Sequence, residues 1–374
     1  MYFELDADQH QLSEATRALL AEGSAGFDRA AWRRGATLGW YGVLVSERYG
    51  GFCLTRRPLV DLVVVAGEFG RAVQPGPFLP TSVVALAIER GGTEEQKRRY
   101  LPDIASGVLV ATWAIAEPGN RWDPSAFSVT AEPAGDGWVL DGVKTLVQDA
   151  EAADLILVTA RAESGLVQLL VPAGTRGLTC TASTGLDRTR RWYDVRFDGV
   201  YVPDSAVLGP EVVAEQLLVA KVLQCAESAA GAARLVELSA GSENSVPREV
   251  AGLHVAAESA AAATYRAALA VADRSPDAAA AVDVAQIVAN DAYAAIADSA
   301  LQSGGDFGED REVSLHLLRA KANQVLFGDS GTHRDHLGGL LELRAAHRNA
   351  GRPDERRAAI PSTAIDERKV SAWR

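Results

Sequence analysis

Histidine and cysteine spacing gives the first test for metal or redox chemistry in this chain. His333 and His336 are three residues apart, so both side chains could face one side of a helix and bind a metal ion. No third ligand is evident, and we therefore interpret the pair as a solvated helix end. Cys53, Cys180 and Cys225 are far apart, odd in number and form no CxxC pair. This spacing argues against a zinc site or a disulfide framework, and the sequence predicts no metal site.

Motifs for nucleotide binding and hydrolysis are also missing. The chain contains no GxGxxG, no P-loop, no GxSxG elbow and no HExxH. Its formal net charge of -12 argues against a nucleic-acid-binding protein. No apolar run reaches the roughly 18 residues needed to span a membrane, and the first residues lack the basic and apolar regions of a signal peptide. We expect a cytoplasmic protein with no nucleic-acid or membrane partner.

The elements that would position a site fall into three regions and a tail. Residues 1–110 are predicted to be helical, with a capping box at 93–96. Residues 111–208 change to short β-branched and apolar runs between turn residues, which predicts an antiparallel barrel or sandwich. Residues 209–343 return to a helical, Ala-rich pattern typical of a bundle. Residues 344–374 have more basic than acidic residues and few large apolar ones, so we expect an extended or disordered tail. The four bundle helices are predicted at 212–238, 254–273, 278–301 and 313–327.

Short motifs in all three regions follow one another in an order that suggests a known family. They are GWYGVLVSERYGG at 39–51, GEFGR at 67–71, GTEEQK at 92–97, AEPG at 116–119, GWVLDGVKT at 137–145, VYVP at 200–203 and QSGG at 302–305. Together they resemble the flavin-dependent acyl-CoA dehydrogenase family, from residue 1 to about 343. The resemblance implies an α+β fold with an N-terminal helical domain, a middle antiparallel β-barrel or sandwich and a C-terminal four-helix bundle, assembled into dimers or tetramers.

The resemblance also implies a reaction. A carboxylate removes the α-proton of an acyl-CoA thioester, and FAD accepts a hydride from the β-carbon. Hydrogen-bond donors at the thioester oxygen stabilise the enolate charge that develops there. The cofactor-binding residues implied by the motifs are Ala116, Asp123 and Gln148, with Gln302, Gly304 and Gly305 approaching from a neighbouring subunit.

This chain departs from the family pattern around the flavin. Ala116 stands where the family usually has Thr, Trp122 replaces a small residue, and Gln148 stands where a Ser or Thr usually faces the flavin. Residues 239–249 match a hairpin that usually carries an Arg and a Gln-Phe-Gly toward a neighbouring subunit's cofactor, but here it looks shortened and lacks Phe-Gly. Fewer donors imply that FAD is bound weakly or shared with a partner subunit. We also expect Trp122 to narrow the mouth of the acyl or flavin pocket.

The catalytic base that the family uses is missing as well. One family position, in the loop after the last bundle helix, corresponds to Phe327, and the other, early in the first bundle helix, corresponds to Lys221. A protonated Lys cannot remove an α-proton, and we do not favour a neutral one. Glu215 and Glu227 flank Lys221 at six residues on either side, roughly 120° around the helix. We interpret both as solvated or capping carboxylates, and the catalytic residue stays unassigned.

Three hypotheses about function remain. The favoured one is a subunit of an acyl-CoA dehydrogenase, either a homo-oligomer or a hetero-oligomer in which a related chain supplies the base and most of the FAD site. The second is a structural or binding subunit with little or no FAD. The third is a flavin oxidase or monooxygenase with the same fold. Flavin absorbance near about 450 nm in the purified protein separates the first two.

Overall fold

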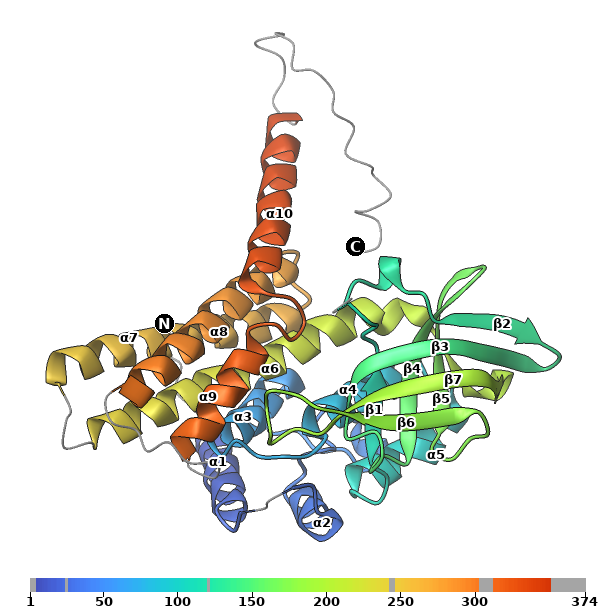
Figure 1. The fold of residues 1–374 in the computed structure, drawn as a ribbon, viewed down its shortest axis with the longest axis horizontal. Helices are drawn as coiled ribbons and strands as arrows, with labels where there is room; N and C mark the ends of the chain where they lie inside the picture. The colour runs from blue at the N-terminus through green and yellow to red at the C-terminus, as the bar shows by residue number, and fades with distance from the viewer. Residues whose placement is uncertain (1–4, 24–25, 120–121, 242–245, 303–311, 351–374) are drawn as a thin grey trace.

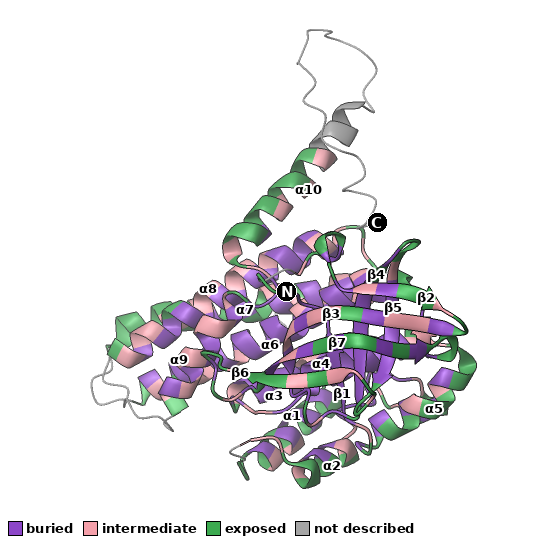
Figure 2. Ribbon diagram, turned by 45° about the vertical axis from the view of Figure 1, so that its right-hand side comes forward, coloured by how far each residue is buried: buried purple, intermediate pink, exposed green. Residues whose placement is uncertain are grey.

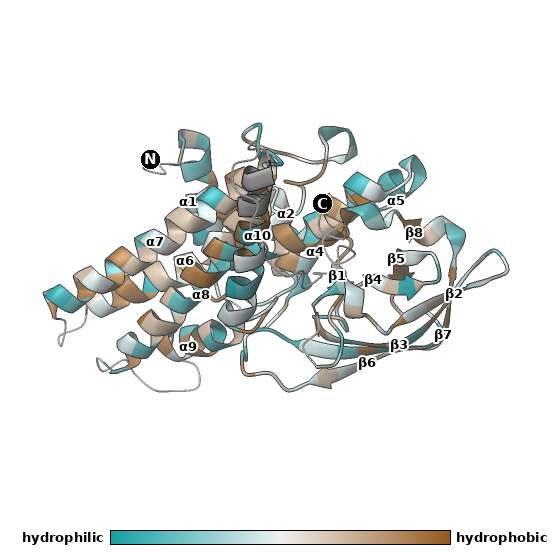
Figure 3. Ribbon diagram, turned by 90° about the horizontal axis from the view of Figure 1, so that it is seen from above, coloured by the Kyte–Doolittle hydropathy of each residue, from teal (hydrophilic) through white to brown (hydrophobic). Residues whose placement is uncertain are grey.

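A computed structural model of the chain describes residues 5–23, 26–119, 122–241, 246–302 and 312–350 (Figure 1). Seen from above, the helical bundle and the sheet lie end to end along the long axis, with α4 between them (Figure 3). Within the described ranges, no helix combines the length and the apolar character that crossing a membrane requires.

The N-terminal region is helical, as predicted. Its last helix begins at the predicted capping box, where the Thr93 hydroxyl accepts the Gln96 N–H at 3.2 Å and the Gln96 side chain accepts the Thr93 N–H at 2.7 Å. Helix α4 is buried over most of its length (Figure 2) and contacts both the sheet and the bundle. The helices are α1 (Ala7–Leu20), α2 (Arg29–Thr37), α3 (Pro58–Arg71), α4 (Phe78–Gly91) and α5 (Glu94–Ala105).

The middle region forms one eight-stranded, mostly antiparallel sheet with the order β6-β7-β3-β2-β4-β5-β8, and β1 pairs with β4 in parallel. Only the pair Thr130 and Arg161 joins β2 to β4. The sheet is therefore two folded layers like a sandwich and not a closed barrel. Its strands are β1 (Ala111–Ala114), β2 (Thr130–Ala134), β3 (Gly137–Gln148), β4 (Leu155–Ala162), β5 (Gly165–Pro172), β6 (Leu178–Ser183), β7 (Trp192–Pro203) and β8 (Val207–Leu208).

The C-terminal region is a helical bundle, as predicted, in which α6 packs against α3, α7 and α8. Helix α7 begins earlier than expected, because Pro247 stands in its first turn, where a proline is favourable. An additional helix, α10, projects from the body (Figure 1) and continues to Ala350, beyond the expected end of the bundle at residue 343. The predicted tail beyond residue 350 lies outside the described residues. The helices are α6 (Val213–Ala240), α7 (Pro247–Ala272), α8 (Ala278–Gln302), α9 (Glu312–Asn323) and α10 (Ser330–Ala350).

Two glycines allow close approaches in the core near the centre of α6, Gly70 to a backbone and Gly231 to a side chain. A Cβ on Gly70 of α3 would lie 2.1 Å from the carbonyl oxygen of Glu227, and a Cβ on Gly231 would lie 2.7 Å from the ring of Tyr293. At Gly70 no other residue fits without a shift of the helices, whereas at Gly231 a side chain would require the Tyr293 ring to move. The two contacts therefore fix α3 and α8 against α6 and hold Glu227 and Tyr293 in place.

Candidate functional site

Of the residues expected to bind the flavin, Gln148 lines a small space where α4, β1, β3 and the loop after α9 meet, together with Trp122 and Phe327. We call this space the central crevice. Its free volume is about 30 Å³, enough for one or two water molecules. It is lined by Leu79, Pro80, Trp113, Ile115, Trp122, Leu146, Gln148, Arg190, Trp192, Leu326 and Phe327.

Two aromatic rings in contact with one another line the crevice. The rings of Trp122 and Phe327 have centroids 4.6 Å apart and are tilted by 55°. Phe327 is buried and has a φ of 63°, a left-handed conformation that is uncommon for a bulky residue. Trp122 lines the crevice, and its narrowing of the mouth of an acyl or flavin pocket stays a prediction. The position of the missing base is thus taken by a ring that packs against another ring.

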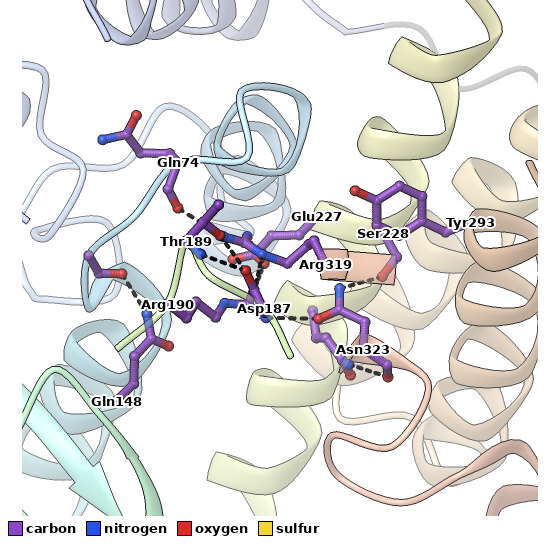
Figure 4. Close-up of polar contacts among 12 residues, drawn as sticks. Gln74, Gln148, Asp187, Thr189, Arg190, Glu227, Ser228, Tyr293, Arg319 and Asn323 are labelled. Carbon is purple, nitrogen blue, oxygen red and sulfur yellow. Dashed lines mark hydrogen bonds and ion pairs between the residues drawn. The ribbon is translucent and has the colours of Figure 1, made fainter. Parts of the chain in front are cut away.

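The polar side chains at the crevice are engaged only in part, because the buried indole N–H of Trp113 has no hydrogen-bond partner among the described residues. Gln148 donates from its side-chain amide to the carbonyl of Gly76 at 2.7 Å (Figure 4). Ala116 is buried, and its carbonyl accepts the Thr145 N–H at 2.9 Å. Its methyl group offers no hydrogen bond, so the expected flavin contacts from Ala116 and Gln148 are weak or occupied.

A buried ion pair anchors the turn that contains Ala116. The Lys144 ammonium group lies 2.9 Å from the Glu117 carboxylate, and both side chains are fully buried. The carboxylate also accepts the backbone N–H groups of Ser128 and Val129. Burial lowers the pKa of Lys144 to about 8, although Glu117 opposes this shift. The family-like Glu-Pro and Lys-Thr motifs therefore serve here to fix two segments of the middle domain to one another.

Asp123 does not lie in the central crevice. Its carboxylate accepts hydrogen bonds from the N–H and hydroxyl of Ser125, at the start of the short 3₁₀ helix Pro124–Ala126. It lines a larger cavity of about 370 Å³ between the β4–β5 hairpin and the start of α6, together with Arg161, Glu211 and Leu217. We call this space the hairpin cavity. Gln302 is exposed at the end of α8, and Gly304 and Gly305 lie outside the described residues.

Four charged side chains form a buried cluster beside the crevice (Figure 4), which we call the arginine–carboxylate cluster: Asp187, Arg190, Glu227 and Arg319. Arg190 pairs with Glu227 and lies 3.7 Å from Asp187. Arg319 lies 2.5 Å from Asp187 and 3.4 Å from Glu227. Two positive and two negative groups thus balance one another away from solvent.

The cluster joins all three regions of the chain. Arg319 of α9 also donates to the carbonyl of Gln74, in the loop between α3 and α4, at 3.3 Å. Arg190, before β7, donates to the side chain of Asn323 at 2.8 Å. Burial alone would raise the pKa of Asp187, but Arg319 and Arg190 hold it below its usual value. Sequence reasoning missed this cluster, because its members are far apart in the chain and no local motif marks them.

Glu227 is not the solvated or capping carboxylate that the sequence indicates. Its side chain is buried between Arg190 and Arg319. The reason is tertiary: α3 crosses α6 closely at Gly70 and removes this part of α6 from water. Glu227 is paired with two arginines and does not line the central crevice, so its position does not supply the missing base.

The histidine pair also differs from the expectation of a solvated helix end. His333 is buried, and its Nδ1 lies 2.9 Å from the carboxylate of Asp283, while Nδ1 of His336 lies 2.5 Å from the same carboxylate. Lys221 is partly buried near Asp283, and burial lowers its pKa against the attraction of that carboxylate. No group of three His, Cys, Asp or Glu residues in the described part of the chain could hold a metal ion.

Comparisons with known proteins identify the family. The N-terminal, middle and C-terminal domain models of acyl-CoA dehydrogenases match residues 8–108, 112–200 and 209–339. The chain belongs to the acyl-CoA dehydrogenase family. Members of this family are FAD-dependent oxidoreductases that act on CH–CH bonds.

Individual relatives align with most of the length of this chain. The acyl-CoA dehydrogenase FadE12 of Mycobacterium tuberculosis is 28% identical over 78% of this chain and 81% of its own length. The L-prolyl-[peptidyl-carrier protein] dehydrogenase of a Serratia species is 24% identical over 84% of this chain and 88% of its own. A solved variant of the Tcur3481–Tcur3483 steroid ACAD is 27% identical, with a TM-score of 0.80 over 91% of this chain and 99% of that one.

The central crevice of this acyl-CoA dehydrogenase homologue does not fit the ring system of FAD. A free volume of about 30 Å³ is too small for a tricyclic ring, and the rings of Trp122 and Phe327 form part of its wall. The groups that could bind the ring's polar edge are the unpartnered indole N–H of Trp113 and the Gln148 side chain, whose amide already donates to Gly76, whereas Ala116 offers only a methyl group.

Proposed function

We propose that this chain is a subunit of a hetero-oligomeric acyl-CoA dehydrogenase, in which a related chain supplies the base and the FAD site for α,β-dehydrogenation of an acyl-CoA thioester. The observation that carries the proposal is the closed central crevice, where Trp122 packs against Phe327. A homomeric enzyme would need that space in every subunit. A flavin oxidase or monooxygenase would need it too, so the same observation disfavours that hypothesis.

The side chains near the expected base positions support this role. Phe327 has no titratable group, and Glu227 is paired with two arginines. Lys221 lies near Asp283, and its ammonium form cannot remove a proton from a thioester. Glu215 lies 3.6 Å from Arg90 and lines a different cavity, described below. None of these groups is an unpaired carboxylate at the crevice.

One of the similar structures is named after two proteins, which also favours an assembly of two related chains. The Tcur3481–Tcur3483 steroid ACAD resembles this chain over nearly the whole length of both. By analogy, we infer that this chain pairs with a second acyl-CoA dehydrogenase chain. The acyl group itself stays undetermined, because the relatives' names include acyl-CoA thioesters, a steroid and a carrier-bound prolyl group.

The second candidate function is thioester binding without turnover, and the hairpin cavity favours it. This cavity of about 370 Å³ has apolar walls with a guanidinium group from Arg161 and carboxylates from Asp123 and Glu211. Such a lining suits a ligand with an apolar chain and amide groups. Calorimetric titration of the purified chain with a saturated acyl-CoA tests it, and Leu217→Trp should abolish the binding by filling the cavity.

The decisive experiment compares the purified chain alone with the chain co-purified with a related acyl-CoA dehydrogenase from the same genome. We expect the chain alone to lack absorbance at about 450 nm and to show no appreciable turnover with added FAD over acyl-CoAs of several lengths and shapes. The absence of a general base alone removes about 10²–10⁴-fold of the rate. The complex should be yellow and active. Robust turnover by the single chain would contradict the proposal.

A further inference from the structure

A third cavity, of about 170 Å³, lies between the N-terminal helices and the bundle and shares no lining residue with the central crevice or the hairpin cavity. Its walls come from the segment at the start of α3, the end of α4, the first turns of α6 and the end of α7. We call it the arginine cavity, because its charged lining residues are Arg56, Arg57, Arg90, Glu215 and Arg274.

The guanidinium groups of this cavity are only partly neutralised. Arg57 makes a two-point contact with Asp273, at 2.7 and 3.0 Å. Glu215 lies 3.6 Å from Arg90 and 3.9 Å from Arg274, beyond hydrogen-bond length in both cases. Four arginines against the two carboxylates leave a formal charge of +2.

Arg56 adds donors that no residue in the described part of the chain uses. It is exposed, and it makes no ion pair or hydrogen bond with any residue in the described part of the chain. The side chains of Arg57, Arg90 and Arg274 are also about half or more exposed, so their donors are open to a ligand from solvent. Like charges drawn together in this way repel one another unless an anion lies between them.

The concentration of positive charge is unusual for this chain, whose formal net charge is -12. Guanidinium groups present planar pairs of donors that match the oxygens of a phosphoryl group. A compact anion with two charges would neutralise the excess at the cavity and fit its volume. We propose that the arginine cavity binds a dianionic phosphoryl group, either as free phosphate or as part of a small phosphate ester.

Binding at this cavity has a consequence for the whole chain. Arg56, Arg57 and Arg90 belong to the N-terminal region, whereas Arg274 belongs to the bundle. A ligand that contacts both regions stabilises the folded state by mass action, in proportion to its concentration. Phosphate should therefore raise the thermal unfolding midpoint of the protein, and chloride at matched ionic strength should not.

The test is calorimetric titration of the full chain with inorganic phosphate, glycerol phosphate and sulfate at constant ionic strength. We expect saturable binding of one phosphoryl group per chain, weakened about tenfold or more by Arg56→Ala and by Arg274→Ala. Glu215→Gln should tighten the binding, because it removes a competing carboxylate. Tighter binding of glycerol phosphate than of phosphate would assign the ligand as an ester, and equal binding would assign it as the free ion.

The matched control is Arg33→Ala, which removes the same charge from an exposed position on α2 outside the cavity. Binding should be unchanged in this variant. An equal loss of affinity in Arg33→Ala, or no saturable binding by the unaltered chain, would overturn the proposal. Because Arg56 and Arg274 are exposed, their variants should keep the unfolding midpoint that the protein has without phosphate, and this measurement confirms that they are folded.

Discussion

Glu227 shows how one residue's surroundings decide between a structural and a catalytic carboxylate. Its oxygens face Arg190 and Arg319, and all three side chains are almost entirely buried. Glu227→Gln would leave two guanidinium groups with one carboxylate, that of Asp187. Breaking a buried pair from one side typically costs about 3–5 kcal/mol. We expect the free energy of unfolding, measured in urea, to fall by about that amount.

The control for this substitution is Glu95→Gln, because Glu95 is exposed in the first turn of α5. Its free energy of unfolding should change by less than about 0.5 kcal/mol. If Glu227→Gln left stability intact and instead abolished dehydrogenation by a complex containing this chain, the residue would be a relocated base.

His316 predicts a pH dependence of stability. It is fully buried, its Nδ1 lies 2.7 Å from the Tyr293 hydroxyl, and burial with the charges of Arg319 and Arg234 lowers its pKa to about 3. A histidine in the unfolded chain has a pKa of about 6.5. Between about pH 3 and about pH 6.5, His316 is therefore protonated in the unfolded chain and neutral in the folded one. This residue's contribution is therefore complete above about pH 6.5 and falls by about 1.4 kcal/mol per pH unit below it.

Urea unfolding at about pH 7 and about pH 5.5 measures this loss. His316→Gln should lose less stability than the unaltered chain between the two values, by about 1.4 kcal/mol. His10→Gln, at an exposed position on α1, should lose as much as the unaltered chain. An equal change in the free energy of unfolding between the two pH values for all three proteins would show that His316 is protonated in the folded state.

At the scale of the elements, the crossing of α3 over α6 buries Glu227 and depends on a glycine at the contact. A Cβ on Gly70 would lie 2.1 Å from the backbone of Glu227, whereas one on Gly67 of the same helix would meet Ala230 at an ordinary 3.6 Å. Gly70→Ala should force the helices apart and lower the free energy of unfolding by about 3 kcal/mol or more. Gly67→Ala should raise it by about 0.5–1 kcal/mol, through helix propensity. If Gly70→Ala and Gly67→Ala changed the free energy of unfolding in urea equally, the close contact of the two helices at Gly70 would be contradicted.

Most elements followed from local patterns in the sequence, and the differences have local causes too. The capping box at Thr93 and the Ala-rich periodicity placed α5 and the bundle helices. Pro247 extends α7 beyond its predicted start, because a proline stabilises a first turn that the apolar pattern does not show. The burial of Glu227 and His333 could not be predicted, because it depends on which helices cross and not on the residues beside them in sequence.

At the scale of the whole molecule, the three regions meet at the central crevice and close it. The N-terminal region contributes Leu79, the middle region contributes Trp122, and the loop after α9 contributes Phe327. The sequence indicated this closure only in part: Trp122 stood out as a bulky residue, whereas its contact with Phe327 joins segments about 200 residues apart and required the fold. The small volume of the crevice is thus a property of the assembled chain, and the proposal of a partner subunit that holds the flavin depends on it.

Opening the crevice should restore affinity for flavin. Trp122→Ser combined with Phe327→Ala removes both rings while the turn at Ala116 stays anchored by Lys144 and Glu117. We expect FAD to bind the double variant about tenfold or more tightly than the unaltered chain, measured by quenching of flavin fluorescence. Trp122→Phe keeps a ring against Phe327 and should bind FAD no better than the unaltered chain. Flavin retained by the unaltered chain through gel filtration, or a double variant that is folded by circular dichroism yet gains no affinity, would show that the two rings are not what excludes the cofactor.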